Sequence, residues 1–121
     1  IQVFPKIRLP RQIPVPAIDL SVLFGNLLDN AIKACSVLED KKERIISVFV
    51  IYQNRNLMIH VKNFFQAGAE IYLHPKNPHG LGLLTVQEIV NAYHGIMDIH
   101  KAGSCFEVRI SLFCHNRTSY N

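Results

Sequence analysis

Tryptophan is absent from this 121-residue sequence, and cysteine occurs three times, at Cys35, Cys105 and Cys114. The count is odd, and no two cysteines have the CxxC spacing that is typical of metal or redox sites. We therefore expect free thiols that act as small buried hydrophobic side chains, in a protein of a reducing compartment.

No stretch of the sequence is apolar for long enough to span a membrane, and the N-terminus lacks the layout of a signal peptide. An initiator methionine is also missing, so we expect the chain to be a fragment of a longer protein. Charged residues make up 18% of the chain, with a formal net charge of +4, and the basic residues are scattered. Scattered basic residues do not favour a nucleic-acid-binding surface.

Hydrophobic residues make up 49% of the sequence, which is ordinary for a globular domain, and the length allows one core. We expect a single domain over residues 1–113 and a polar, frayed tail over residues 114–121. The proline-containing residues 1–16 predict an extended lead-in with an edge strand over residues 3–9.

Two segments have the apolar spacing of helices that lie against a core. Apolar residues at three- and four-residue steps predict a helix over residues 20–38, with Asp19 as its N-cap. A second helical pattern covers residues 83–93 and is expected to end with Gly95 in the C′ position.

The remaining segments are rich in β-branched and aromatic residues or lack any period. The element order α-β-β-α-β-β predicts an α/β fold, a two-layer α/β sandwich in which one mixed sheet packs against two main helices. Strands are expected at 45–53, 57–63, 96–101 and 105–113, turns at 54–56 and 102–104, a charged connector at 39–44 and a loop at 64–78.

Three polar residues share one narrow stripe of the first predicted helix. On a helical wheel Asn30 lies about 40° from Asn26, and Lys33 lies about 20° from Asn26 on the other side. Gly25 lies beside them, and asparagine and glycine each cost roughly 0.5–1 kcal/mol against alanine in a helix interior. Such a group of unfavourable residues is typical of a binding site. A solvated helix face, or asparagines that bond to loops across the core, would also explain the stripe.

The sequence His79-Gly80-Leu81-Gly82 precedes the second predicted helix. Glycine lets a backbone approach a ligand closely, and a helix N-terminus offers unpaired N–H groups and partial positive charge. His79 could donate a hydrogen bond to a phosphate oxygen. An ordinary entry turn would also explain the two glycines, but together with the asparagine stripe they favour a phosphate site.

The polar stripe contains the residue types that a magnesium–polyphosphate site needs. Mg²⁺ keeps several waters and takes few protein ligands beyond the phosphates that it bridges. The carboxamide oxygen of Asn30 would suffice as the protein ligand. Lys33, one turn further on, could act as a point charge for the terminal phosphate.

Residues 23–34 (Leu-Phe-Gly-Asn-Leu-Leu-Asp-Asn-Ala-Ile-Lys-Ala) resemble the N box of the GHKL superfamily, which includes gyrase, MutL and the histidine kinases. Residues 79–83 resemble the G2 box of the same superfamily, and residues 103–106 resemble its last hairpin. The resemblance covers roughly residues 3–113. It is greatest to sensor histidine kinases of the quorum-sensing, peptide-pheromone receptor type.

This resemblance implies a Bergerat-type ATP-binding fold in which Asn30 coordinates Mg²⁺ and in which Asn26 and Lys33 lie near the phosphates. It assigns residues 79–82 to phosphate binding. In the ATP-hydrolysing members of the superfamily, a glutamate in the place of Asn26 activates water. An amide cannot act as a general base at neutral pH, so Asn26 implies a phosphotransferase and not a hydrolase.

The sequence departs from the superfamily at the G1 box, where residues 63–67 (Asn-Phe-Phe-Gln-Ala) replace Asp-x-Gly-x-Gly. The resemblance puts Asn63 in the place of the aspartate that accepts a hydrogen bond from the adenine amino group, and an amide oxygen could do the same. A turn residue at the end of a strand is the alternative for Asn63. The segment between Asn63 and His79 is short for a nucleotide lid, so we expect weak ATP binding.

The resemblance implies the ATP-binding catalytic domain of a two-component sensor histidine kinase. Such a domain presents Mg-ATP to a histidine on a helical dimerisation domain outside this chain, and a response regulator is an indirect partner. It also implies a cytoplasmic domain of a bacterial membrane protein. We identify no general base and no phosphoacceptor histidine, so the chain alone should bind nucleotide without autophosphorylation. A degenerate or anti-sigma-like nucleotide-dependent binding module, or a structural module without a ligand, stays open as an alternative.

Overall fold

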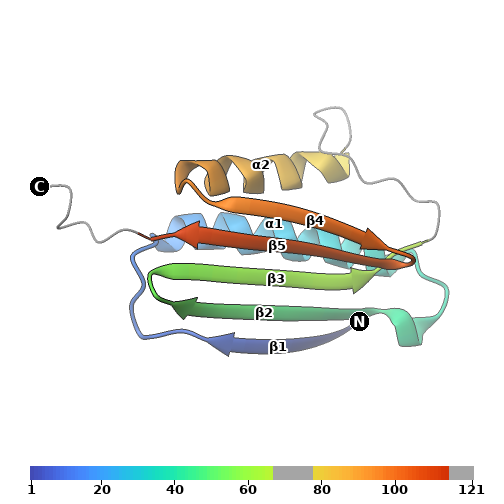
Figure 1. Cartoon of the computed structure of the whole chain (residues 1–121). Helices are drawn as coiled ribbons and strands as arrows, with labels where there is room; N and C mark the ends of the chain where they lie inside the picture. Colours follow the sequence, from blue (N-terminus) through green and yellow to red (C-terminus); the bar gives the residue numbers. More distant parts are fainter. Residues whose placement is uncertain (67–77, 115–121) are drawn as a thin grey trace, which may run out of the picture.

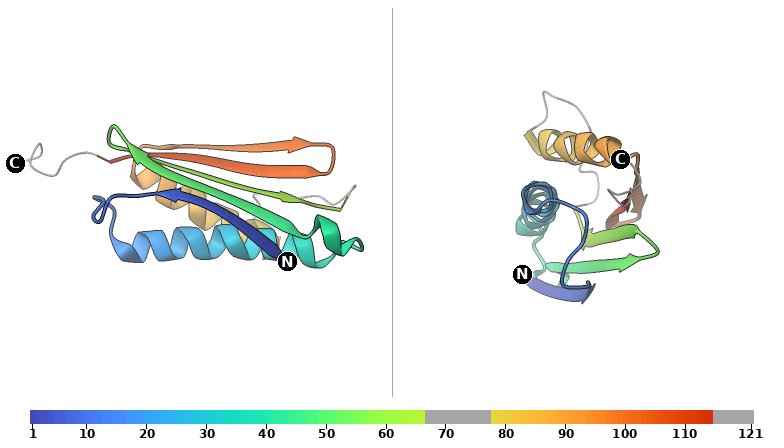
Figure 2. Two further views of the ribbon diagram at one scale, coloured as in Figure 1. Left: turned by 90° about the horizontal axis from the view of Figure 1, so that it is seen from below. Right: turned by 90° about the vertical axis from the view of Figure 1, so that its left-hand side faces the viewer.

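The computed structural model describes residues 1–66 and 78–114, with residues 78–81 described in their backbone only. Two helices lie on one face of a five-stranded sheet, and no described element covers the other face (Figures 1 and 2). The predicted two-layer α/β sandwich is therefore confirmed. None of the described helices is long and apolar enough to cross a membrane. In chain order the elements are β1 (Gln2–Arg8), α1 (Ala17–Ser36), a 3₁₀ turn (Lys41–Glu43), β2 (Ile45–Gln53), β3 (Asn56–Phe64), α2 (Pro78–Ala92), β4 (Ile96–Ala102) and β5 (Cys105–Phe113).

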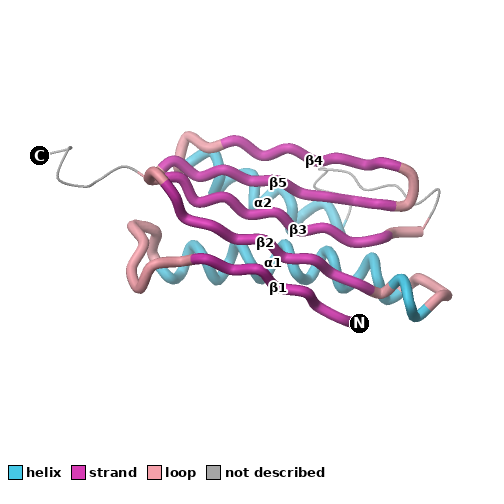
Figure 3. The backbone as a smooth tube through the Cα atoms, turned by 60° about the horizontal axis from the view of Figure 1, so that its bottom comes forward, coloured by secondary structure: helices cyan, strands magenta, loops and turns pink. Residues whose placement is uncertain are grey.

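The sheet has the strand order β1-β2-β3-β5-β4 (Figure 3). β1 runs parallel to β2 and the other neighbouring strands are antiparallel, which makes the sheet mixed, as predicted. The predicted edge strand is also confirmed, because β1 pairs with β2 at the edge of the sheet and all seven of its residues are exposed. α1 packs on β2 and β3, and α2 packs on β4 and β5.

Alternation along the strands turns every second side chain toward the helices. The alternating apolar residues of β3 and β5 are buried, and so are the facing residues of β2. The two helices add apolar stripes at three- and four-residue spacing to the same core. Within the strands and helices the core consists of Ile46, Val48 and Val50 from β2, Leu57, Ile59 and Val61 from β3, Phe106, Val108, Ile110 and Leu112 from β5, and Leu23, Leu27, Ala31, Cys35, Leu83, Val86 and Val90 from the helices, and Val15, Phe65 and Cys114 join it from the adjoining segments.

α1 begins at Ala17, before its predicted start, and the prediction that Asp19 is its N-cap is wrong. Pro16 takes the N-cap position with φ −56° and ψ 141°, so the proline ring fixes the entry and no side-chain hydrogen bond caps the helix. Asp19 lies in the first turn, where the helix dipole favours a carboxylate. This carboxylate accepts a 2.6 Å hydrogen bond from the Tyr93 hydroxyl, which ties the start of α1 to the end of α2.

α2 ends in a Schellman motif. The prediction that Gly95 is the C′ residue is wrong by one position, because Gly95 is the C″ residue. His94 occupies C′ with φ 54°, and its N–H donates to the Asn91 carbonyl at 3.0 Å. The Gly95 N–H donates to the Val90 carbonyl at 2.8 Å, as the C″ residue does in this motif. A Cβ at Gly95 would overlap the backbone oxygen of Ser111 in β5, so this position requires glycine for space.

Tight turns join the antiparallel strand pairs. Asn54 and Arg55 connect β2 to β3 with φ values of 53° and 63°, which is typical of a two-residue type I′ turn and is shorter than predicted. The predicted turn between β4 and β5 contains Gly103 with φ 62°. Cys114, which we predicted to begin the frayed tail, is buried, and its N–H donates to the Arg55 carbonyl at 2.7 Å. The rest of the predicted tail, residues 115–121, lies outside the described residues.

The three cysteines are free, as predicted. Cys35 and Cys114 are buried, and burial raises the pKa of both thiols above the usual value, so little thiolate forms at neutral pH. Cys105 is half-buried on the outer face of the sheet, opposite the helices. Cys35 and Cys114 therefore act as small core residues, as expected for buried thiols.

Substitution of Gly95 by alanine is expected to lower the free energy of unfolding by about 1–3 kcal/mol, because the added methyl group overlaps a backbone oxygen. Gly25→Ala is the matched control, since a Cβ at Gly25 in α1 would meet no heavy atom within 4 Å. The control change should raise the free energy of unfolding by roughly 0.5–1 kcal/mol, because alanine is the better helix former. Urea unfolding followed by circular dichroism measures both, and equal effects of the two changes would contradict the close contact at Gly95.

Candidate functional site

Four segments meet at one end of the molecule. β3 ends there, α2 begins there, and the turn between β4 and β5 and the second half of α1 lie at the same end (Figure 1). The Phe65 N–H donates to the Ser104 carbonyl at 2.9 Å, which joins the end of β3 to that turn. The hydrogen bond from Tyr93 to Asp19 lies at the opposite end of the helix pair, so α1 and α2 run antiparallel. The asparagine stripe and the glycine stretch are thereby brought together.

Asn26 of α1 and Gly82 of α2 face each other directly. A Cβ at Gly82 would lie 3.0 Å from the Asn26 Oδ1, which is closer than side chains normally pack. The Asn26 Nδ2 donates to the Val22 carbonyl at 2.8 Å, so Oδ1 is the amide atom that faces α2. The missing side chain at residue 82 lets the two helices approach here, and the two motifs are in contact.

The stretch of residues 79–82 lies within α2 and not before it. α2 begins at Pro78, whereas the sequence pattern placed its start at Leu83. Proline is favoured at the first helical position, because its φ is preset and an N–H there would have no helical partner. Both glycines therefore belong to the first turns of the helix, where the leading N–H groups lack intrahelical partners. The side chains of residues 78–81 and most of the predicted lid, residues 67–77, lie outside the described residues.

Asn30 is buried beside the helix pair, with 8% of its surface exposed, so the solvated-stripe explanation is wrong for this residue. Its side chain makes no hydrogen bond within the described part of the chain, and the loop-bonding explanation finds no support there. Among the described residues no fully buried side-chain nitrogen or oxygen lacks a partner, so the Asn30 amide keeps contact with solvent. A buried amide that is unpaired and still reachable fits a ligand of Mg²⁺. No cluster of three or more His, Cys, Asp or Glu residues in the described ranges could hold a metal ion.

Lys33 lies on the solvent side of the stripe. Its Nζ forms an ion pair with the Asp29 Oδ2 at 2.8 Å, and the two side chains are 46% and 59% exposed. An exposed pair at this helical spacing contributes about 0.3–0.5 kcal/mol, so the ammonium group can leave it for a stronger anion at small cost. The phosphate contact of Lys33 stays a prediction.

Asn63 lies on the inner face of β3, with 3% of its surface exposed. It pairs within the sheet with Ile46 and Phe106, so the alternative explanation, a turn residue at the end of a strand, is wrong. The Asn63 Nδ2 donates to the Phe64 carbonyl at 2.8 Å, which leaves Oδ1 as the hydrogen-bond acceptor of this side chain. The amide is therefore oriented to accept, as the aspartate of the superfamily does by resemblance.

Two residues at this end of the sheet were not predicted from the sequence. Phe65 is buried and packs edge-on against Phe106, with ring centroids 6.1 Å apart and ring planes at 71°. The Lys101 Nζ lies 5.7 Å from the centroid of the Phe65 ring. The sheet register places Lys101 opposite Phe106, in the row that also contains Asn63. Only the register of the last hairpin could have indicated from the sequence that Lys101 lies near the site, because by residue type Lys101 resembles any surface lysine.

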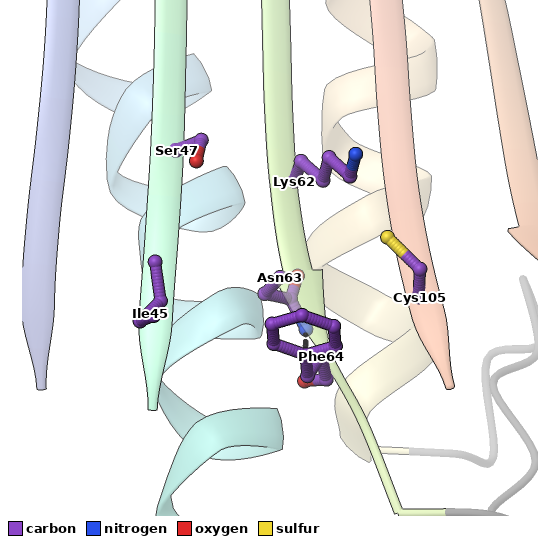
Figure 4. A pocket seen from close by; sticks show the side chains of 6 residues that line it. All are labelled: Ile45, Ser47, Lys62, Asn63, Phe64 and Cys105. Atoms are coloured by element: carbon purple, nitrogen blue, oxygen red, sulfur yellow. Dashed lines mark hydrogen bonds between the residues drawn. The ribbon is translucent and has the colours of Figure 1, made fainter. Parts of the chain in front are cut away.

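A pocket of about 170 Å³ opens on the outer face of the sheet (Figure 4). Both helices lie behind the strands in this view, so the pocket is on the far side of the sheet from the asparagine stripe (Figure 4). Its volume is below the roughly 300–1,000 Å³ of typical small-molecule sites, and we do not assign it as the candidate site. The lining residues are Ile45, Ser47, Lys62, Asn63, Phe64 and Cys105.

Replacement of Asn30 by leucine is expected to raise the free energy of unfolding of the ligand-free protein by about 1 kcal/mol, because leucine buries apolar surface where a largely buried amide makes no hydrogen bond to the protein. Asn63→Leu is the control, since it should lower the free energy of unfolding by about 1–3 kcal/mol by removing the donor to the Phe64 carbonyl. Chemical unfolding without nucleotide measures both variants. A loss of stability in Asn30→Leu as large as that in Asn63→Leu would contradict the description of Asn30 as unpaired.

Comparison with known families gives one match over most of the chain. A family model described as a GHKL domain matches residues 15–113. No curated protein matches the sequence.

Solved structures of histidine kinases have the same fold. The histidine kinase AdeS of Acinetobacter baumannii superposes with a TM-score of 0.68 at 19% identity, over 94% of this chain and 55% of that chain. The catalytic domain of histidine kinase ThkA gives a TM-score of 0.67 at 16% identity, over 92% of this chain and 76% of that chain. Full-length ShkA in complex with AMPPNP gives a TM-score of 0.62 at 15% identity, over 92% of this chain and 25% of that chain. The chain thus spans about half of the AdeS structure.

Proposed function

The chain belongs to the GHKL domain family, and on this premise we propose that it is the ATP-binding catalytic domain of a two-component sensor histidine kinase. The observation that carries the proposal is the buried, unpaired amide of Asn30, one helical turn from the contact between Asn26 and Gly82. These residues place an amide oxygen near the N-terminus of a helix. One of the structures with this fold was solved in complex with AMPPNP, which supports a nucleotide as the ligand.

The residues at the phosphate end would hold Mg-ATP by position and charge. Asn30 would give Mg²⁺ one amide ligand, and the unpaired N–H groups at the start of α2 would donate to phosphate oxygens. Lys33 would exchange its weak pair with Asp29 for the terminal phosphate. When bound, Mg²⁺ neutralises charge on the phosphate oxygens during transfer.

The adenine end would rest on Asn63. Asn63 lies among the buried residues on the helix side of β3, and its Nδ2 is held by the Phe64 carbonyl at 2.8 Å, which leaves Oδ1 as an acceptor. The amide oxygen would accept a hydrogen bond from the adenine amino group. Guanine has a carbonyl oxygen at the same place, which would face this acceptor without a hydrogen bond, so the orientation favours adenine nucleotides.

Asn26 favours transfer of the phosphoryl group to another protein group and not to water, because an amide cannot take a proton from water at neutral pH. The proposed acceptor is a histidine on a helical dimerisation domain of the parent protein, which would pass the phosphoryl group to a response regulator. We further propose that the parent is a bacterial membrane receptor and that this domain is cytoplasmic. The degenerate or anti-sigma-like alternative gains no support from the family match or from the structures named above.

Mg-ATP is expected to raise the melting temperature of the chain, and Asn30→Ala should lose most of the Mg²⁺-dependent part of this increase. The substitution removes the proposed protein ligand of the metal. Asn91→Ala is the matched control, because Asn91 is an exposed asparagine of α2 whose side chain bonds to Gln87. Thermal-shift titrations with ATP, ADP and GTP, with and without Mg²⁺, measure the effect. An unchanged Mg²⁺-dependent increase in Asn30→Ala would contradict the assignment of the metal ligand.

The isolated chain is not expected to phosphorylate itself, because the proposed phosphoacceptor histidine belongs to another domain. Incubation with γ-labelled ATP and Mg²⁺ should leave the chain unlabelled. Label should appear on a histidine when the helical dimerisation domain of the parent is added, and Asn30→Ala should abolish this transfer. Radiolabel on the chain alone would contradict the proposal that the phosphoacceptor histidine belongs to another domain.

A further inference from the structure

Lys101 lies on the inner face of the sheet at the end where the proposed nucleotide site lies. Along β4, Met97 and Ile99 pack against the core at alternate positions, and Lys101 continues this series. Its cross-strand neighbour is Phe106 of β5, whose neighbour on the other side is Asn63 of β3. The backbones of Lys101 and Asn63 are thus two strand spacings apart, about 10 Å, and the buried Phe106 side chain lies between them.

The Lys101 side chain is exposed, and its ammonium group lies over the ring of Phe65. The Nζ lies 5.7 Å from the centroid of the ring, within the range of a cation–π contact. The ring is itself held in place, because it is buried against Phe106 and because the Phe65 N–H donates to the Ser104 carbonyl at 2.9 Å. The ammonium group is therefore positioned beside the row that contains the buried asparagine of β3.

The charge of Lys101 has no anionic partner among the described residues. The ion pairs in that part of the chain join Lys33 to Asp29 and Arg109 to Glu107. Glu107 alternates with buried residues of β5 and lies on the outer face, away from the helices. The base end of the site thus combines the neutral amide of Asn63 with the cation of Lys101, which no described carboxylate neutralises. By the resemblance described above, Asn63 stands where other superfamily members have an aspartate.

We infer that Lys101 binds the adenosine half of ATP, and this inference rests on the proposed function. The ring nitrogens of adenine and the oxygens of ribose are uncharged acceptors, and an ammonium donor forms charge-assisted hydrogen bonds with such atoms. Asn63 accepts from the adenine amino group while Lys101 donates to an acceptor of the same half of the nucleotide. Together the two residues would pair with both a donor and an acceptor of the ligand.

Lys101→Met removes the charge and keeps the length of the side chain, whereas Lys101→Arg keeps the charge and the contact with Phe65. Lys101→Met is expected to weaken the binding of ATP and of ADP by the same factor, about tenfold. Lys101→Arg should retain most of the affinity. Lys62→Met is the matched control, because Lys62 is an exposed lysine at the same end of the sheet on its outer face. Calorimetric titration of the whole chain with each nucleotide in Mg²⁺ measures the dissociation constants.

The outcomes separate this inference from the proposed function. If the wild-type chain binds neither nucleotide, the proposed function fails. If it binds both and Lys101→Met binds them equally well, or if Lys101→Arg is as weak as Lys101→Met, the role of Lys101 fails alone. A loss for ATP without a loss for ADP would place Lys101 at the terminal phosphate and would also overturn the inference. Urea unfolding without nucleotide must show equal stability of the methionine and arginine variants for the loss to count as binding.

Discussion

The antiparallel packing of α1 against α2 is the constraint on which the rest of the structure depends. At one end the Asn26 amide meets the bare backbone of Gly82, where a Cβ would lie 3.0 Å from Oδ1. At the other end the Tyr93 hydroxyl donates to the Asp19 carboxylate at 2.6 Å. A close approach at one point and a hydrogen bond at the other fix the spacing of the two helices between these contacts. The polar stripe of α1 consequently lies beside the seam between the helices, neither in the core nor fully in solvent.

This position explains how an amide can be buried and still lack a partner. Asn30 is 8% exposed and makes no hydrogen bond within the described residues, yet the core around it is apolar and complete. Because its polar atoms keep contact with solvent, the partial burial of this group opposes folding by less than the roughly 1–3 kcal/mol of a fully desolvated amide. Proteins retain local costs of this kind at functional sites, where a ligand supplies the missing partner. The stability of the fold and the chemistry of the site therefore compete at this residue.

The parts of the fold that follow from side-chain periodicity could be predicted from the sequence. Alternation in β3 and β5 and the apolar steps of α1 report which face meets the core, so the sandwich and its layers were correct. The helix ends were less accurate, because Pro16 and Pro78 begin their helices through backbone geometry, and because the positive φ of His94 leaves no mark in a side-chain pattern. The contact between the two motifs was expected, whereas Lys101 was missed, since its place depends on register between strands far apart in the sequence.

The structure divides recognition of the proposed ligand between its two layers. In the proposed function the helices would supply the groups for the metal and the phosphates, through Asn26, Asn30 and the first turn of α2. The sheet would supply the groups for the base, through Asn63 and Lys101. The helix groups are positioned by helix packing and the sheet groups by strand register, so one set can change without displacing the other. This independence accounts for a chain that keeps the asparagine stripe intact while its sheet end departs from the superfamily. On the proposed function, an amide in place of a carboxylate at the base end would alter how firmly a nucleotide is held and would leave the phosphate end unchanged.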